Sequence, residues 1–226
     1  AVPLEEPLGT EAYRADLVSA VDGLDAEAGT SALRVRYRRH LLRLAAWDLE
    51  HSDPLAAMPA VGAALADLAG AALDAGLAIA RRTSTFSAPE VAATRLAIIG
   101  MGKCGARELN YLSDVDVIYA VDAGDGVELP RAVEIATRLA TATARSIQEP
   151  GIEPPLWEGK DGALVRSLDS HRAYYERWAK NWEFQALVKA RPLAGDHGVG
   201  EGFLAITGPL VWESSQREGF VEQVQG

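Results

Sequence analysis

The chain has 226 residues, enough for one large domain or two small ones with a hydrophobic core. Its 48% hydrophobic and 24% charged residues are typical of a soluble globular protein. The formal net charge of -10 argues against a surface that binds the phosphates of nucleic acid. No segment reads as a secretory signal or as an apolar stretch long enough to cross a bilayer. A single cysteine cannot form an internal disulfide, as expected of a protein of the reducing cytosol.

The first third of the chain is predicted to be helical. We expect helices over residues 13–24, 31–49 and 59–82, with a break before the last one at Pro54. Apolar side chains of the second helix share one face, namely Leu33, Tyr37, Leu41 and Leu44. Its opposite face, which is either a solvated surface or a docking surface for an acidic partner, carries Arg34, Arg36, Arg38, Arg39 and Arg43.

A mixed helix and strand pattern follows the polar break after residue 82. Two buried strands are expected over residues 95–100 and 115–121, separated by a turn that contains glycines. A short helix is expected to open near Ser87, before the first strand. Further along we expect, in order, a helix over residues 130–148, short strands at 156–157 and 163–165, an aromatic-rich helix over 168–189, and a weaker helix from 196 that is interrupted near Pro209.

Two carboxylates, Asp114 and Asp116, lead into the second predicted strand. Strand side chains alternate, so both should face one way while Val115 and Val117 face the core. Two neighbouring carboxylates repel each other unless a cation lies between them, and Mg²⁺ prefers such oxygen ligands together with water and substrate phosphate. That arrangement suits phosphoryl chemistry. The tripeptide alone also fits an ordinary turn in which one Asp caps the backbone.

The glycines before the acid pair strengthen the metal interpretation. Gly100 and Gly102 follow the first strand and let the backbone approach a phosphate, to which Lys103 adds a positive charge. Residues 105–109 are expected to begin a helix whose N-terminus faces that phosphate. A glycine turn followed by an Asp-x-Asp pair resembles the DNA polymerase β-like nucleotidyltransferases. The resemblance implies an α+β fold with a helical region at 1–88, a small mixed-sheet core at 89–196 and a C-terminal helical segment at 197–226.

The motif supports a narrower resemblance. The run from Gly100 to Asp116, GMGKCGARELNYLSDVD, resembles the signature of bifunctional glutamine synthetase adenylyltransferases, and its RELNY string is the most specific part. Further matches lie at Tyr174-Tyr175, Trp182-Glu183 and Lys189-Ala190-Arg191. Members of this family carry two such domains. One adds AMP to a tyrosine of glutamine synthetase, and the other removes it by phosphorolysis with release of ADP. The Gly-Met-Gly start with Arg107 and Asn110 resembles the first of the two domains, which is the adenylyl-removing copy.

The family resemblance implies roles for particular residues. Asp114 and Asp116 are expected to be the catalytic metal ligands, for Mg²⁺ or Mn²⁺. Phosphate or nucleotide is expected at Gly100, Gly102, Lys103, Ser113, Lys189 and Arg191, although the last two also fit favourable charges at a helix C-terminus. The implied partners are glutamine synthetase, an adenine nucleotide, inorganic phosphate, a second adenylyltransferase domain and a nitrogen-signalling regulator. Nucleic acid and membrane are not expected partners, and the expected location is the cytoplasm.

Some residues depart from the family pattern. Cys104 stands where the family commonly has Leu, and it is either a thiol of lowered pKa at a helix start or a buried apolar filler. After Trp157-Glu158 the family continues with a third Asp and an Arg-Leu-Arg-Pro run, whereas here Glu158 meets Gly159 directly. Either that segment is deleted or it is missing from the sequence as given. A true deletion would remove a third metal ligand.

Other candidate residues have ordinary interpretations. The aromatic side chains of Tyr175, Trp178 and Trp182 are expected in the core rather than as a platform for adenine. The histidines have no ligand spacing and are expected to be structural or exposed: His40, His51, His171 and His197. Two alternatives to phosphorolysis remain: ATP-dependent adenylylation of the same tyrosine, and a non-catalytic docking module for glutamine synthetase. A template-reading polymerase is disfavoured by the acidic charge.

Overall fold

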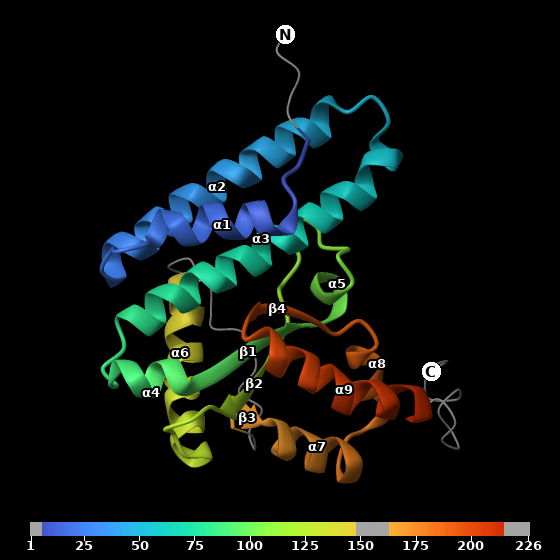
Figure 1. The fold of residues 1–226 in the computed structure, drawn as a ribbon. Coiled ribbons are helices and arrows are strands. Elements are labelled where there is room, and N and C mark those ends of the chain that lie inside the picture. Colours follow the sequence, from blue (N-terminus) through green and yellow to red (C-terminus); the bar gives the residue numbers. More distant parts are fainter. Residues whose placement is uncertain (1–5, 148–162, 215–226) are drawn as a thin grey trace.

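The computed structural model describes residues 6–147 and 163–214, which form a mixed sheet flanked by helices (Figure 1). The strands are β1 (Thr94–Gly100), β2 (Val117–Ala123), β3 (Val165–Ser167) and β4 (Arg191–Gly195), in the spatial order β3-β2-β1-β4. β1 pairs antiparallel with both β2 and β4, whereas β2 and β3 are parallel. The α+β fold expected from the sequence is therefore confirmed.

Helices make up most of the described residues. In chain order they are α1 (Thr10–Val21), α2 (Ala26–Glu50), α3 (Pro54–Arg82), α4 (Ala88–Ala93), α5 (Gly102–Gly105), α6 (Leu129–Ile147), α7 (Leu168–Arg177), α8 (Asn181–Leu187) and α9 (His197–Ser214). The first three form a layer above the sheet, and α5 lies between that layer and the end of β1 (Figure 1). The division at residues 1–88, 89–196 and 197–226 remains a prediction.

Helix α3 is the central element of the fold. It packs against α1 and α2 on one side and against α6 and β4 on the other. We expected no segment long and apolar enough to cross a bilayer, but α3 reaches that length and has a mean hydropathy of 1.6 over its most apolar window. Because 89% of this window is buried inside the protein, α3 has the burial of a core helix. It begins five residues before the predicted start, because the Asp53 carboxylate accepts hydrogen bonds from the N–H groups of Leu55 and Ala56, and Pro54 takes a first-turn position that needs no N–H.

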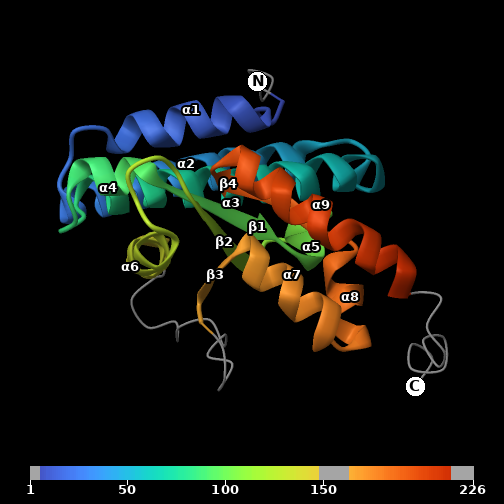
Figure 2. The ribbon, with the colours of Figure 1, turned by 60° about the horizontal axis from the view of Figure 1, so that its bottom comes forward.

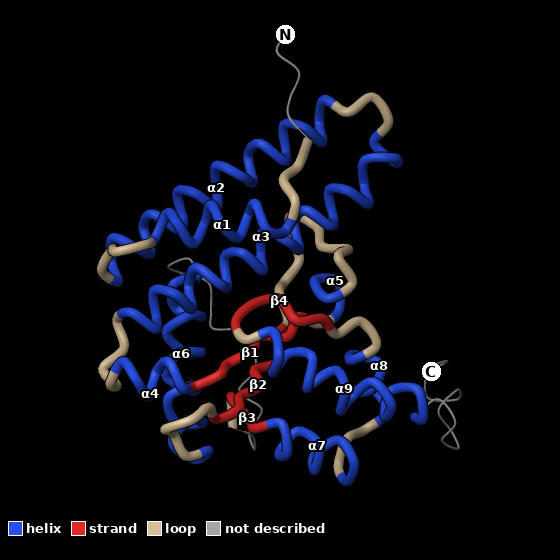
Figure 3. The backbone as a smooth tube through the Cα atoms, viewed as in Figure 1, coloured by secondary structure: helices blue, strands red, loops and turns tan. Residues whose placement is uncertain are grey.

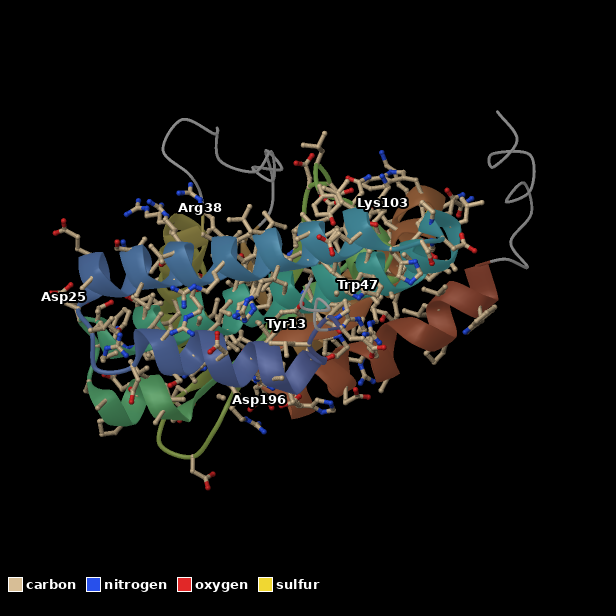
Figure 4. The ribbon with its side chains drawn as sticks, turned by 90° about the horizontal axis from the view of Figure 1, so that it is seen from above. Tyr13, Asp25, Arg38, Trp47, Lys103 and Asp196 are labelled. Carbon is tan, nitrogen blue, oxygen red and sulfur yellow. The ribbon has the colours of Figure 1, made fainter. Side chains whose placement is uncertain are left out.

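Helix α2 buries the face that its sequence pattern predicts. Leu33 and Leu44 are each 2% exposed, and Tyr37 and Leu41 pack at the edge of the same cluster. The helix starts at Ala26 rather than near residue 31, because the Asp25 carboxylate caps it through the N–H of Ala28 at 2.8 Å. Asp25 lies at one end of this long helix and Trp47 toward the other (Figure 4).

The sheet separates two hydrophobic clusters. Leu96 and Ile98 of β1 face a cluster with α6, whereas Ala97 and Ile99 face a cluster with α7, α8 and α9. This alternation is the two-residue period of a strand buried on both faces. Figure 2 shows α6 on one side of the strands and α7 and α9 on the other. β1 pairs with β2 from Thr94 to Gly100, and its glycine-bearing end also pairs with β4.

The C-terminal helices differ from their predicted extents. The helix expected over residues 168–189 is split into α7 and α8, because Tyr175 and Phe184 both enter the cluster around Phe203. Nine residues apart on one straight helix, they would point in opposite directions. The interruption expected near Pro209 is wrong, since α9 runs through it to Ser214. Val199 and Phe203 before the proline are at most 2% exposed, and Leu210 and Val211 after it pack against the same cluster, so burial on both sides of Pro209 favours a continuous helix.

The remaining boundaries shift by a few residues. The strand expected from residue 115 begins at Val117, and the one expected over 163–165 is Val165–Ser167. The capping box of Ser87 and Glu90 starts α4 as expected. The predicted strand at residues 156–157, the junction of Glu158 with Gly159 and the last residue of the predicted helix 130–148 lie outside the described residues.

Candidate functional site

The glycine bend, residues 100–105, comprises the last residue of β1, Met101 and the single turn α5. Gly102 has a φ of 52°, a left-handed conformation that glycine adopts without strain. Gly105 has no room for a side chain, because an added Cβ would lie 1.9 Å from the carbonyl oxygen of Lys189. The helix of this region is the single turn α5; the helix expected over residues 105–109 is wrong, because the chain leaves the helical conformation after Gly105 and Arg107 has a φ of 61°.

The acid pair lies immediately before β2, in a segment that is neither helix nor strand. Asp114 and Asp116 are exposed, whereas Val115 between them is partly buried against two core clusters, as the alternation predicts. The N–H of Met101 donates to the carbonyl oxygen of Asp116 at 2.9 Å, which ties the acid pair to the glycine bend. A Cβ built on Gly102 would lie 3.8 Å from Oδ2 of Asp116. The absence of a side chain at Gly102 therefore leaves space beside this carboxylate.

The donor set suits a hard divalent cation. Exposed carboxylate oxygens are ligands that Mg²⁺ and Mn²⁺ accept, with water and substrate phosphate completing the coordination. Within residues 6–147 and 163–214, no group of three or more His, Cys, Asp or Glu side chains gathers in a metal-binding arrangement. The acid pair fits such a cation through two carboxylates. The third Asp that the family resemblance implies after Glu158 is not in this sequence, where Gly159 follows directly, and that junction lies outside the described residues.

Lys103 and Ser113 lie close to the bend in the chain. Lys103 is the second residue of α5 and is exposed. In Figure 4 it lies on the side of α2 that faces away from α1. The hydroxyl of Ser113 accepts from the N–H of Asn110 at 3.4 Å, and the N–H of Ser113 donates to the carbonyl oxygen of Asn110 at 3.2 Å. Ser113 thereby closes the loop that precedes the acid pair. The expected role of Lys103 and Ser113 in phosphate binding remains a prediction.

Lys189 and Arg191 reach the glycine bend from the start of β4. The Lys189 ammonium pairs with the carboxylate of Glu108 at 2.6 Å. The Arg191 guanidinium donates from Nε to the carbonyl oxygen of Gly105 at 3.1 Å and from Nη2 to that of Cys104 at 3.2 Å. Both cations therefore stabilise the bend and the residues after it. Their expected contact with phosphate remains a prediction.

Residues 106–113, which we name the anchor loop, connect the bend to the acid pair and contact the helical layer. Arg107 pairs with Asp67 of α3 at 2.5 Å, and Tyr111 donates its hydroxyl hydrogen to Asp48 of α2 at 3.1 Å. Leu109 is 7% exposed and belongs to the core cluster of the helical layer. The loop extends from the sheet toward α3 before the chain enters β2 (Figure 3). The RELNY string, singled out above only by resemblance, thus makes tertiary contacts along its length.

Asp67 is the residue at this site that sequence reasoning missed. A carboxylate inside an Ala- and Leu-rich helix indicates that the fold supplies a buried cationic or hydrogen-bonding partner, because a buried charge without a partner costs several kcal/mol. Asp67 and Asp74 are the two such residues of α3, at 3% and 9% exposure. Only Asp67 points to the anchor loop; Asp74 pairs with Arg14 at 2.8 Å and accepts from the N–H of Gly195.

Cys104 is a buried filler rather than a reactive thiol. It is 1% exposed, and burial raises the pKa of its thiol to about 11. The thiol is therefore protonated at neutral pH, and thiolate chemistry is disfavoured. Of the two interpretations offered by the sequence, the second is confirmed.

The aromatic residues of α7 and α8 divide between core and surface. Tyr175 is 6% exposed and lies in the core, as expected. Trp178 and Trp182 are 74% and 54% exposed, so the expectation that they are core residues is wrong. The short segment between α7 and α8 turns Tyr175 and Phe184 inward and leaves both tryptophans on the outside.

Two of the four histidines have buried structural contacts. His40 contacts the carboxylate of Asp16 at 2.7 Å, and Nε2 of His171 lies 3.1 Å from the carbonyl oxygen of Tyr119. Since a carbonyl oxygen only accepts, Nε2 of His171 carries a hydrogen. His197 is largely exposed. These placements confirm structural or surface roles for the three residues.

The arginine-rich face of α2 combines charge with exposed apolar side chains. Val35, Leu42 and Leu49 are 60%, 71% and 87% exposed. Arg36 pairs with Asp16 of α1 at 3.0 Å, and Arg38 projects from the side of α2 that faces away from α1 (Figure 4). Both interpretations of this face, a solvated surface and a docking surface, remain open.

Comparison with known proteins places the chain in a family. A family model described as glutamate-ammonia ligase adenylyltransferase matches residues 2–206. The chain is 58% identical over 229 residues to the bifunctional glutamine synthetase adenylyltransferase/adenylyl-removing enzyme of Leifsonia xyli subsp. xyli, covering 93% of this chain and 23% of that protein. Proteins of the same name from Streptomyces avermitilis and Mycobacterium bovis are 47% and 46% identical over 225 and 198 residues, covering 96% and 85% of this chain and 21% and 19% of theirs.

The chain spans about a fifth of the length of these relatives, whereas the matches cover most of the chain itself. The family model includes the glycine bend, the anchor loop, the acid pair and both cations at the start of β4. The fold and the motif that led to the resemblance are therefore part of the matched region. The chain belongs to the glutamate-ammonia ligase adenylyltransferase family.

Proposed function

We propose that the chain catalyses phosphorolytic removal of AMP from an adenylylated tyrosine of glutamine synthetase. In this reaction an oxygen of inorganic phosphate attacks the adenylyl phosphorus, the bond from phosphorus to the tyrosine oxygen breaks, and the products are ADP and tyrosine. The observation that carries the proposal is the carboxylate of Asp116 beside the Cβ-free face of Gly102, with Asp114 exposed two residues earlier. Phosphoryl transfer depends mainly on positioning and on charge stabilisation, which these groups can supply.

The charges at the site explain why a divalent cation belongs in the proposal. Phosphate and an adenylyl group are anionic, and the carboxylates of Asp114 and Asp116 would repel them. When bound by these carboxylates, Mg²⁺ or Mn²⁺ would supply charge neutralisation at the reacting phosphorus. The exposed Lys103 and the backbone at Gly102, which carries no side chain, would bind the phosphate. The ion pair of Lys189 with Glu108 keeps the adjoining segment in place.

The direction of the reaction rests on the motif. Arg107 and Asn110 in the string after the glycine bend resemble the adenylyl-removing copy, and the relatives carry both activities in their names. Glutamine synthetase is the proposed macromolecular partner, with phosphate and an adenine nucleotide as the small ligands. A second adenylyltransferase domain, a nitrogen-signalling regulator and a cytoplasmic location complete the proposal.

The proposal is tested with adenylylated glutamine synthetase, ³²P-labelled phosphate and Mg²⁺. Purified protein that carries the chain should release ADP labelled in its β-phosphate. Asp114→Asn and Asp116→Asn should each abolish release, because each removes a charged ligand. Asp125→Asn is the matched control, since Asp125 is an exposed carboxylate just past the opposite end of the same strand β2. It should retain the wild-type rate. Equal rates in all three variants would remove the acid pair from the mechanism.

The two alternatives give different results in the same assays. If the chain instead transfers AMP from ATP to the tyrosine, it would label unmodified glutamine synthetase from α-³²P ATP. It would then release no labelled ADP in the assay with ³²P-labelled phosphate. A docking module would bind glutamine synthetase without metal and without turnover. Either result would replace phosphorolysis as the function of this chain.

A further inference from the structure

Asp67 is a buried carboxylate in the middle of α3 whose partners all belong to other elements. Its residue is 3% exposed. Oδ2 accepts from the hydroxyl of Thr10 at 2.9 Å and pairs with Nη2 of Arg107 at 2.5 Å. Oδ1 has no hydrogen-bond partner among the described residues, and Nη2 of Arg191 lies 3.9 Å from it. A buried charge of this kind is retained only where its partners compensate for desolvation.

Both arginines near Asp67 act on the segments that form the candidate site. Arg191 donates to the carbonyl oxygens of Cys104 and Gly105, which end α5. Arg107 is the second residue of the anchor loop and has a left-handed backbone, with a φ of 61°. A non-glycine residue in that conformation is strained and persists where its surroundings hold it. The ion pair with Asp67 supplies such a restraint at the point where the chain leaves the glycine bend.

The anchor loop also packs directly on α3. A Cβ added to Gly62 would lie 3.3 Å from Cα of Glu108 and 3.3 Å from the carbonyl oxygen of Leu109. Helix and loop therefore touch backbone to backbone, five residues before Asp67 on α3. This contact and the burial of Leu109 do not depend on the charge of Asp67. Removing that charge should loosen the Arg107 end of the loop without detaching the loop from the helix.

We propose that Asp67 is a positioning residue: through Arg107 and Arg191 it holds the anchor loop and the glycine bend so that the acid pair lies beside Gly102. The helical layer then forms part of the catalytic unit rather than only supporting the sheet. The rate measurements below rest on the proposed function, whereas the exchange and metal-binding measurements do not.

Asp67→Asn and Asp74→Asn form a matched pair of variants. Both residues are buried aspartates of α3, two helical turns apart, and each pairs with an arginine. Asp74 differs in that its partners, Arg14 and the N–H of Gly195, lie away from the glycine bend. The Asn side chain keeps the shape of Asp and removes the charge. Both variants should lose stability, but only Asp67→Asn should affect the site.

Three measurements separate positioning from a general loss of stability. Amide hydrogen exchange of residues 102–113 should become about tenfold faster in Asp67→Asn, since the loop opens locally, and should stay within about twofold of wild type in Asp74→Asn. The dissociation constant for Mn²⁺, measured by electron paramagnetic resonance, should rise about tenfold in Asp67→Asn only. In the phosphorolysis assay kcat should fall about tenfold while KM for adenylylated glutamine synthetase stays unchanged.

Arg107→Gln tests the same link from the other side. Its side chain is 47% exposed, so the change removes little buried packing, and the hydroxyl of Thr10 and the guanidinium of Arg191 remain near the Asp67 carboxylate. If Asp67 acts through Arg107, the Arg107→Gln variant should reproduce the faster exchange and the weaker Mn²⁺ binding, and the double variant should be no worse than either single one. Wild-type exchange and wild-type Mn²⁺ binding in Arg107→Gln would overturn the proposal. So would equal effects of Asp67→Asn and Asp74→Asn on the site.

A failure of the proposed function is distinguishable from a failure of this inference. If the wild-type protein releases no ADP, phosphorolysis is wrong, and the exchange rates and Mn²⁺ affinities still decide whether Asp67 positions the loop. If ADP is released normally by Asp67→Asn and by Arg107→Gln, phosphorolysis stands and the positioning role is rejected.

Discussion

His171 makes the stability of the fold sensitive to acid, and replacing it with glutamine isolates the effect. The imidazole donates from Nε2 to the carbonyl oxygen of Tyr119 at 3.1 Å and packs edge-on against Phe203, with ring centroids 5.0 Å apart. Burial lowers the pKa of His171 from 6.5 to about 4. Glutamine offers an amide N–H at a similar reach along the side chain, but it does not titrate.

The magnitude follows from the two pKa values. Because the folded-state pKa is lowered, the unfolded chain binds a proton where the native protein does not, and the free energy of unfolding falls as the pH falls from 6.5 to about 4. The stabilisation is fully present above the pKa of the unfolded state, 6.5, and is lost as the pH falls through the folded-state pKa of about 4. At about 1.36 kcal/mol per pH unit the full effect is about 3 kcal/mol. Roughly 1 kcal/mol of it is lost between about pH 7 and pH 5.5, a range in which most carboxylates stay ionised.

Urea denaturation followed by circular dichroism measures the effect at about pH 7 and about pH 5.5. Wild type should lose about 1 kcal/mol more than His171→Gln over this interval. His197→Gln is the control. Because the His197 side chain is 82% exposed, this variant should keep the wild-type pH dependence of stability. If His171→Gln shows the same pH dependence as wild type, the buried imidazole is not the acid-sensitive group and the argument from its environment fails.

Three further experiments probe the bend and the core. The thiol of Cys104, with its pKa raised to about 11, should react with a disulfide reagent only when the protein unfolds; rapid labelling of the native protein would contradict its burial. Gly102→Ala and Gly126→Ala, at φ of 52° and 91°, should each cost about 1 kcal/mol in urea denaturation, but only the first should slow ADP release, because its Cβ faces Asp116. Phe184→Ala should destabilise the protein by about 3–5 kcal/mol and Trp182→Ala by no more than about 0.5 kcal/mol; equal losses would contradict the break between α7 and α8.

Local periodicity was enough to predict the main elements. The apolar face of α2 and the alternation of buried side chains in β1 follow from spacing alone, since each side chain's direction is set by its own helix or strand. The position of the acid pair between the bend and β2 also follows from chain order. The first and last residues of the helices could not be predicted from spacing, because capping and packing determine where a helix begins and ends. Asp25 and Asp53 start helices earlier than the hydrophobic pattern indicates, and Pro209 is accommodated in α9.

The contacts that shape the candidate site could not be predicted from spacing. Asp67 and Arg107 lie forty positions apart, and nothing in the local pattern of either residue identifies its partner. The basic character of Arg191 did not indicate that it donates to two carbonyl oxygens of α5, and its expected contact with phosphate remains a prediction. Trp178 and Trp182 were expected in the core because they are aromatic, but the break after α7 turns them outward. In each case a contact between distant segments decides the outcome.

X-ray diffraction from crystals containing Mn²⁺ and ADP tests the central claim most directly. We predict an anomalous scattering peak bound by the carboxylates of Asp114 and Asp116, with a phosphate of ADP against the backbone of Gly102. Crystals of Asp116→Asn should lose the peak. An ordered ADP molecule without a Mn²⁺ peak at the acid pair, or a peak bound elsewhere on the chain, would contradict the account.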